Sequence, residues 1–84
     1  MKILNTKNLK LKKSINKKIQ ALVQLLHHDL LSLEHEIQIY LDSLKPSFIN
    51  DWHIMADPNS PDLSFIIEVF DLNNYPMEFY FKLP

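Results

Sequence analysis

The sequence lacks glycine, cysteine and arginine entirely across its 84 residues. Without glycine there is no phosphate-binding P-loop, no dinucleotide-binding glycine fingerprint and no glycine-flanked nucleophile elbow, because each needs backbone that only glycine supplies. Without cysteine there is no disulfide, thiolate zinc site or thiol nucleophile. A dedicated phosphate clamp would usually include arginine, whose planar fork binds bidentately. These absences exclude the commonest enzyme and nucleotide-binding motifs.

The composition is that of one folded domain, which we place over residues 1–84. Apolar residues make up 46% of the chain and charged residues 23%, close to globular averages of roughly 45–50% and 25%. No apolar run approaches the roughly 18–20 residues that cross a bilayer, so we expect no integral membrane association. Lysine without arginine, with frequent Asn and Ile, fits an AT-rich genome. We expect a cytoplasmic protein of a bacterium or phage, without a targeting segment.

Charge is separated along the chain. Residues 1–18 hold seven lysines and no acid, whereas residues 19–84 hold two lysines and all ten acids, which gives charges of +7 and −8. Such asymmetry indicates either a basic arm that contacts phosphates or an acidic body that contacts a basic partner. A third interpretation is that the lysines only keep the chain soluble.

The spacing of apolar residues predicts one long helix over residues 14–45. The apolar positions are Ile15, Ile19, Leu22, Leu26, Leu30, Leu33, Ile37, Leu41 and Leu44. Their period of about 3.6 places them on one stripe that can lie on a sheet. Ser14 is a suitable N-cap, and Pro46 ends the helix. The alternative is a break near His27–Asp29, with Asp29 capping a second helix.

The opposite side of this helix carries a heptad-like seam. Its members are Ala21, Gln24, His28, Leu31, His35 and Gln38. The seam can be a helix–helix contact between two copies or a solvated face. Together with the apolar sheet face described in the next paragraph, the seam leads us to predict a homodimer.

Three segments with alternating apolar residues predict strands, at 48–56, 63–70 and 77–83. Two turn clusters separate them, and Asn in the second can adopt positive φ in place of glycine. The predicted fold is α+β, with one long N-terminal helix packed on a three-stranded antiparallel meander (α-β-β-β) over residues 47–84. Phe48, Trp52, Ile54 and Ala56 are expected on the core side of the first strand. Met55, Ile66, Phe70 and Tyr80 are expected on the other sheet face.

Charge also predicts the register of the last hairpin. One register sets Val69 opposite Phe79 and Glu68 opposite Tyr80. The register shifted by two residues would set Glu68 directly opposite Glu78, and like charges so placed repel. We therefore predict the first register.

No group of residues predicts catalysis. His28 and His35 lie two helical turns apart, about 10 Å along the axis, so one ion cannot bind both within one helix. Carboxylates on strands usually mark the solvated face. We predict no catalytic residue, no metal site and no cofactor.

The function predicted from charge is a non-enzymatic protein-interaction module, a small inhibitor or immunity-type protein that binds and blocks a basic protein partner. The acids expected to contact the partner are Asp57, Asp62, Glu68, Asp71 and Glu78. The alternative is a nucleic-acid-binding regulator, such as an antitoxin or phage protein, with a basic arm over residues 1–13. Its phosphate contacts would be Lys7, Lys10, Lys12, Lys13, Lys17 and Lys18. A third possibility is an amphipathic membrane contact by residues 12–26.

Overall fold

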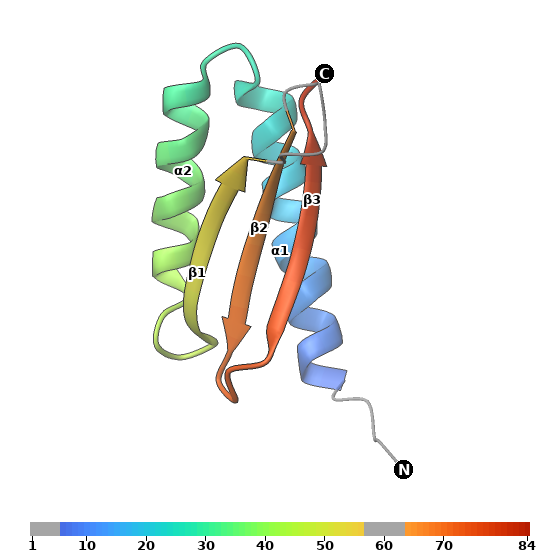
Figure 1. Cartoon of the computed structure of the whole chain (residues 1–84), viewed down its shortest axis with the longest axis vertical. Coiled ribbons are helices and arrows are strands. Elements are labelled where there is room, and N and C mark those ends of the chain that lie inside the picture. The colour runs from blue at the N-terminus through green and yellow to red at the C-terminus, as the bar shows by residue number, and fades with distance from the viewer. Residues whose placement is uncertain (1–5, 57–63) are drawn as a thin grey trace.

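The computed structural model describes residues 6–56 and 64–84. Its elements are α1 (Thr6–Leu26), α2 (Leu30–Ser43), β1 (Ile49–Ala56), β2 (Ser64–Asp71) and β3 (Pro76–Lys82). The strands form an antiparallel sheet in the order β1-β2-β3. Both helices lie side by side behind one face of this sheet (Figure 1). The predicted α+β class and the meander are confirmed, but the N-terminal helix is split in two.

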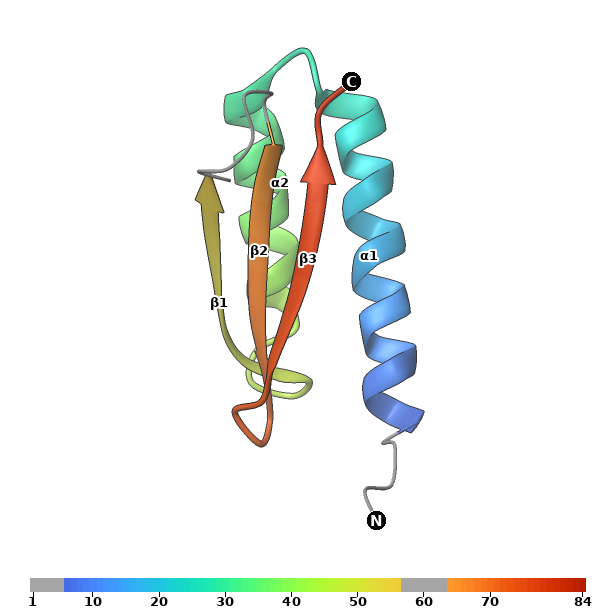
Figure 2. The same ribbon diagram turned by 45° about the vertical axis from the view of Figure 1, so that its right-hand side comes forward.

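The turn between the helices falls where the sequence offered a break. Asp29 is the N-cap of α2, and its carboxylate accepts hydrogen bonds from the Ser32 amide at 3.1 Å and the Ser32 hydroxyl at 2.8 Å. As a result α2 runs back antiparallel to α1 (Figure 2). A single helix of about 31 residues would span about 46 Å, whereas an eight-residue strand spans about 26 Å. Folding back therefore lets the sheet bury both halves of the apolar stripe.

The start of α1 also differs from the prediction. The helix begins at Thr6, eight residues before Ser14, so much of the expected arm over residues 1–13 is helical. Lysine and leucine dominate this segment, and both favour helix. The lysines of this segment that the structure describes are therefore held on a rigid element.

The apolar stripe of the helices packs on the inner face of the sheet. The buried core consists of Ile15, Ile19, Leu22, Val23, Leu33, Ile37, Leu41, Ile49, Ile67, Val69, Met77, Phe79 and Phe81. The indole of Trp52 donates a hydrogen bond to the Asp42 carboxylate at 2.8 Å, which joins β1 to the end of α2. All predicted stripe residues from Ile15 to Leu41 are buried or partly buried except Leu30.

A bulge at Asn50 changes which residues at the start of β1 face the core. The register moves from Ile49 opposite Asp71 to Asp51 opposite Phe70, so Asn50 is the extra residue. Its side-chain amide donates a hydrogen bond to Oδ1 of Asn74, in the turn between β2 and β3, at 2.8 Å. Ile49 is fully buried, whereas Phe48 is 56% exposed. The prediction that Phe48 faces the core is therefore wrong, because period-two counting cannot include a bulge.

The predicted register of the β2–β3 hairpin is wrong as well. Glu68 lies opposite Glu78, and Val69 lies opposite Met77. The carboxylate of Asp71 accepts hydrogen bonds from the amides of Asn73 and Tyr75, at 2.8 and 2.9 Å. Hydrogen bonds to a charged group contribute about 1.5–3 kcal/mol each, whereas an exposed like-charge pair costs a few tenths to about 1 kcal/mol. The turn therefore determines the register against the charge repulsion.

Candidate protein-binding face

The sheet face turned away from the helices is the candidate site, and we call it the open face. It faces the viewer in Figure 1, and neither helix covers it. Strand alternation places eleven side chains on it: Asp51, His53, Met55, Ser64, Ile66, Glu68, Phe70, Pro76, Glu78, Tyr80 and Lys82. Charged and apolar groups are thus held together on a rigid surface of three paired strands.

An acidic row crosses the middle of the open face. His53, Glu68 and Glu78 occupy paired positions on β1, β2 and β3. Glu68 lies on the central strand and is partly buried, whereas its two neighbours are exposed. Among the described residues, no ion pair involves either glutamate. Two adjacent carboxylates here repel each other and attract a cation from outside.

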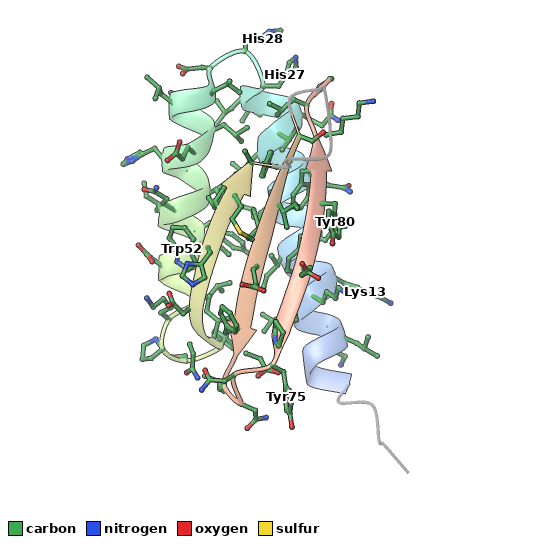
Figure 3. All side chains as sticks on the ribbon, in the orientation of Figure 1. Lys13, His27, His28, Trp52, Tyr75 and Tyr80 are labelled. Carbon is green, nitrogen blue, oxygen red and sulfur yellow. The ribbon has the colours of Figure 1, made fainter. Side chains whose placement is uncertain are left out.

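An apolar row lies beside the acidic row. Met55, Ile66 and Tyr80 occupy the next set of paired positions. Tyr80 is 65% exposed, and Met55 is also exposed. The Tyr80 side chain projects from β3 in Figure 3. Phe70 lies on the other side of the acidic row, and its ring is nearly perpendicular to that of His53, with centroids 5.8 Å apart.

Asp51 adds negative charge at the lower end of this face. A hydrogen bond from the Trp52 amide, at 2.8 Å, lowers the pKa of Asp51, and desolvation opposes it only in part. Lys45 lies 3.7 Å away and His53 lies 4.0 Å away, and both also lower this pKa. The Asp51 carboxylate is therefore ionised throughout the neutral pH range.

The structure separates the five acids predicted to contact a partner. Glu68 and Glu78 lie side by side on the open face. Asp71 is only 2% exposed, and its carboxylate holds the hairpin turn. Asp57 and Asp62 lie outside the described residues.

Sequence reasoning missed two polar residues of the open face, Asp51 and His53. The sequence contained the information to find them. Asp51, His53 and Met55 occupy alternate positions of one strand, and Met55 was predicted on this face.

The lysines predicted to contact nucleic acid lie on α1. Lys10, Lys12, Lys13, Lys17 and Lys18 are all exposed. Two of them lie near aromatic rings: Lys12 Nζ is 6.0 Å from the Phe79 centroid and Lys18 Nζ is 5.9 Å from the Tyr40 centroid. Lys7 belongs to the first turns of the same helix. The basic segment is therefore a charged helix surface, and two of its lysines, Lys12 and Lys13, lie beside Glu78 and Tyr80 of β3.

Within residues 6–56 and 64–84, no three His, Asp or Glu side chains are grouped so that they could hold a metal ion. No helix in the same ranges is long and apolar enough to cross a membrane. No protein-family model, curated protein or solved structure matches the chain. The geometry and charge of its surfaces are therefore what indicate a function for this chain.

Proposed function

We propose that the chain is a non-enzymatic protein-binding module that holds a basic protein partner on the open face and blocks it, as a small inhibitor or immunity-type protein does. The observation that supports this proposal is the pairing of Glu68 with Glu78. The pairing repels within the chain, and the described residues supply no ion pair to offset it. A lysine or arginine of the partner, placed between the two carboxylates, would turn repulsion into attraction.

The apolar row supports a protein partner in particular. Met55 and Tyr80 are exposed and Ile66 between them is partly buried, and together they form an apolar surface next to the charged one. Protein interfaces combine an apolar centre with charged groups, and Tyr and Met are enriched in them. A free cation or a nucleic-acid phosphate would gain no favourable contact from these apolar side chains.

The test compares which proteins three forms of the full chain capture, and how tightly. The forms are the wild type, E68Q/E78Q and the matched control E34Q/E36Q, which removes two exposed carboxylates from α2. A protein retained from a lysate of the source cells is identified, purified and titrated by calorimetry. We expect a basic protein whose affinity falls at least about tenfold with E68Q/E78Q, as for a lost buried charge pair. E34Q/E36Q should bind as the wild type does.

E68Q/E78Q also has a built-in control for folding. Relief of the like-charge pair should leave this variant at least as stable as the wild type in urea unfolding. Equal affinity of wild type and E68Q/E78Q for every captured protein would refute the proposal. Loss of binding in both glutamine variants alike would mean that net charge, not the open face, recruits the partner.

A second candidate function is binding of nucleic acid by α1. It is favoured by the helical placement of Lys10, Lys13 and Lys17, whose spacing of three and four residues forms one exposed stripe. We expect K10Q/K13Q/K17Q to abolish DNA or RNA binding in a filter assay, and wild-type affinity to fall steeply with salt. Affinity that is absent, or insensitive to salt, would eliminate this candidate.

A further inference from the structure

The outer edge of β3 is a second surface, which adjoins the open face along Glu78, Tyr80 and Lys82. β3 is an outer strand and pairs only with β2 among the described strands. The backbone groups along such an edge can pair with another strand. Pro76 begins β3 and Lys82 ends it, and both residue types discourage edge pairing. The stretch from Glu78 to Phe81 between them is the part that can accept a partner.

The helix α1 turns this edge into a groove. In Figure 1 the N-terminal half of α1 emerges from behind β3. A cavity of about 400 Å³ lies between the two elements, and a second of about 230 Å³ lies further along β3. Tyr80 lines both cavities, and in Figure 3 its side chain and that of Lys13 project on the same side of the molecule. We call this the β3–α1 groove; its α1 wall consists of Leu9, Lys12, Lys13, Asn16, Gln20 and Gln24, with Val23 behind.

The lining indicates the kind of occupant. Leu9 and Phe79 provide an apolar floor, and Lys12 and Lys13 stand beside it. The Lys12 ammonium lies over the Phe79 ring, at the margin of the groove. Glu78 is the one acid that lines either cavity among the described residues. An apolar floor beside a strand edge suits an extended polypeptide, whose alternate side chains can fill it, better than a phosphodiester backbone.

We propose that the β3–α1 groove binds an extended segment of a partner protein that adds a fourth strand to β3 and directs carboxylates to Lys12 and Lys13. Main-chain hydrogen bonds along Glu78–Phe81 would give affinity, and the charge of α1 would select acidic segments. This inference does not depend on the open-face proposal. The other outer strand is a poorer template, because the bulge at Asn50 interrupts it.

A second copy of the chain fits this groove less well than a single strand. Paired strands lie about 4.8 Å apart, whereas packed helices need about 8–10 Å. Edge-to-edge pairing of two β3 strands about a two-fold axis would bring both α1 helices into the same layer behind the strands. The spacing of the paired strands is smaller than the spacing that two packed helices need. A lone segment brings no helix with it.

The experiment uses a capped peptide, Glu-Val-Thr-Val-Thr-Val-Glu, titrated into the isotope-labelled full chain and followed by NMR. We expect saturable amide shifts along β3 and at Leu9–Asn16, with slower hydrogen exchange of the outward-facing β3 amides. The same peptide with lysine in place of glutamate should bind about fivefold more weakly, because its two attractive ion pairs are lost. A peptide N-methylated on alternate residues, which cannot complete the ladder, should not bind.

Two protein variants test whether Lys12 and Lys13 of α1 cause the preference for the glutamate peptide. K12Q/K13Q should weaken binding about threefold, whereas K17Q/K18Q, the same change outside the groove, should not. The inference is overturned if β3 amides do not respond to the peptide, if the lysine peptide binds equally well, or if both variants act alike. It is also overturned if the same shifts arise from protein concentration alone, which would indicate a second copy, or from a DNA oligonucleotide in place of the peptide.

Discussion

At the scale of single residues, Asp71 has the largest consequence for this molecule. Its buried carboxylate binds two turn amides, and its backbone carbonyl accepts from Asn74 at 2.9 Å. Asn74 adopts a φ of 64°, the positive value expected of asparagine in this glycine-free turn. The turn then sets the register that brings Glu68 beside Glu78. An interior hydrogen-bonding group thus creates the feature on which the open-face proposal depends.

We predict that Asp71→Ala lowers the free energy of unfolding by about 2–4 kcal/mol, because two turn amides lose their acceptor inside a nearly buried site. Urea unfolding followed by circular dichroism measures this loss. Asn73→Ala in the same turn serves as the control, because its side chain is exposed, and should change stability by less than about 0.5 kcal/mol. Similar effects of the two variants would show that the carboxylate does not organise the hairpin.

At the scale of elements, the turn between α1 and α2 converts one apolar stripe into two helices that cover the sheet. It also divides the seam predicted on the opposite helical face. Ala21 and Gln24 lie on α1, whereas Leu31, His35 and Gln38 lie on α2, which runs antiparallel. The seam is therefore not one continuous stripe, and a dimer contact along a single long helix is not available. The N-cap at Asp29 is what begins the second helix.

We predict that this cap makes stability depend on pH in the acidic range. Hydrogen bonds from the Ser32 hydroxyl and amide lower the pKa of Asp29 below its ordinary value of 3.8. Because the folded pKa lies below the unfolded one, the stabilisation is present above about pH 3.8 and is lost as pH falls through the folded value. The thermal midpoint should therefore decline in this window.

Asp29→Asn isolates this contribution, because asparagine keeps a capping oxygen but has no charge to lose. Thermal unfolding by circular dichroism, stepped downward from about pH 5, should show a shallower decline for the variant than for the wild type. Part of the decline should persist, since the pKa of Asp51 is lowered as well. An identical decline in both proteins would show that the Asp29 charge does not stabilise α2.

At the scale of the whole molecule, opposite charges occupy different surfaces. The lysines of α1 lie on the helix layer, and the acidic row lies on the opposite face of the sheet. The two meet along β3, where Lys12 and Lys13 line a cavity with Glu78. This arrangement suits a module that presents distinct surfaces to distinct partners, with steering by charge. Two features led to the prediction of a homodimer. The helical seam is divided between α1 and α2, so only the apolar part of the open face still supports that prediction.

We predict a homodimer that forms weakly through the open face. Stacking two such faces would bury Met55, Ile66 and Tyr80 but would also bring four carboxylates together. Sedimentation velocity should therefore show tighter association for E68Q/E78Q than for the wild type, with E34Q/E36Q unchanged. A chain that stays monomeric at millimolar concentration in all three forms would rule the dimer out.

The sequence by itself determined the three strands, the apolar stripe of the helices and the pattern of charge. Apolar period and alternation predicted the buried stripe and three strands. Asp29 was the alternative N-cap of a second helix, and asparagine was expected to adopt positive φ in the second turn cluster, as Asn74 does. These features are local, since each depends on residues within a few positions of one another. Glu68 and Glu78 were likewise recognised as residues of the solvated sheet face.

Only the tertiary structure decided how these elements meet. The helix divides because the sheet is too short for an unbroken one, Ile49 replaces Phe48 in the core because Asn50 bulges, and the hairpin register follows Asp71. In the first two outcomes, contacts between distant segments override a local preference. In the third, hydrogen bonds within the hairpin turn outweigh the repulsion between Glu68 and Glu78 by more than a few tenths of a kcal/mol. The β3–α1 groove belongs to this second class, because it exists only where a helix from one end of the chain lies along a strand from the other.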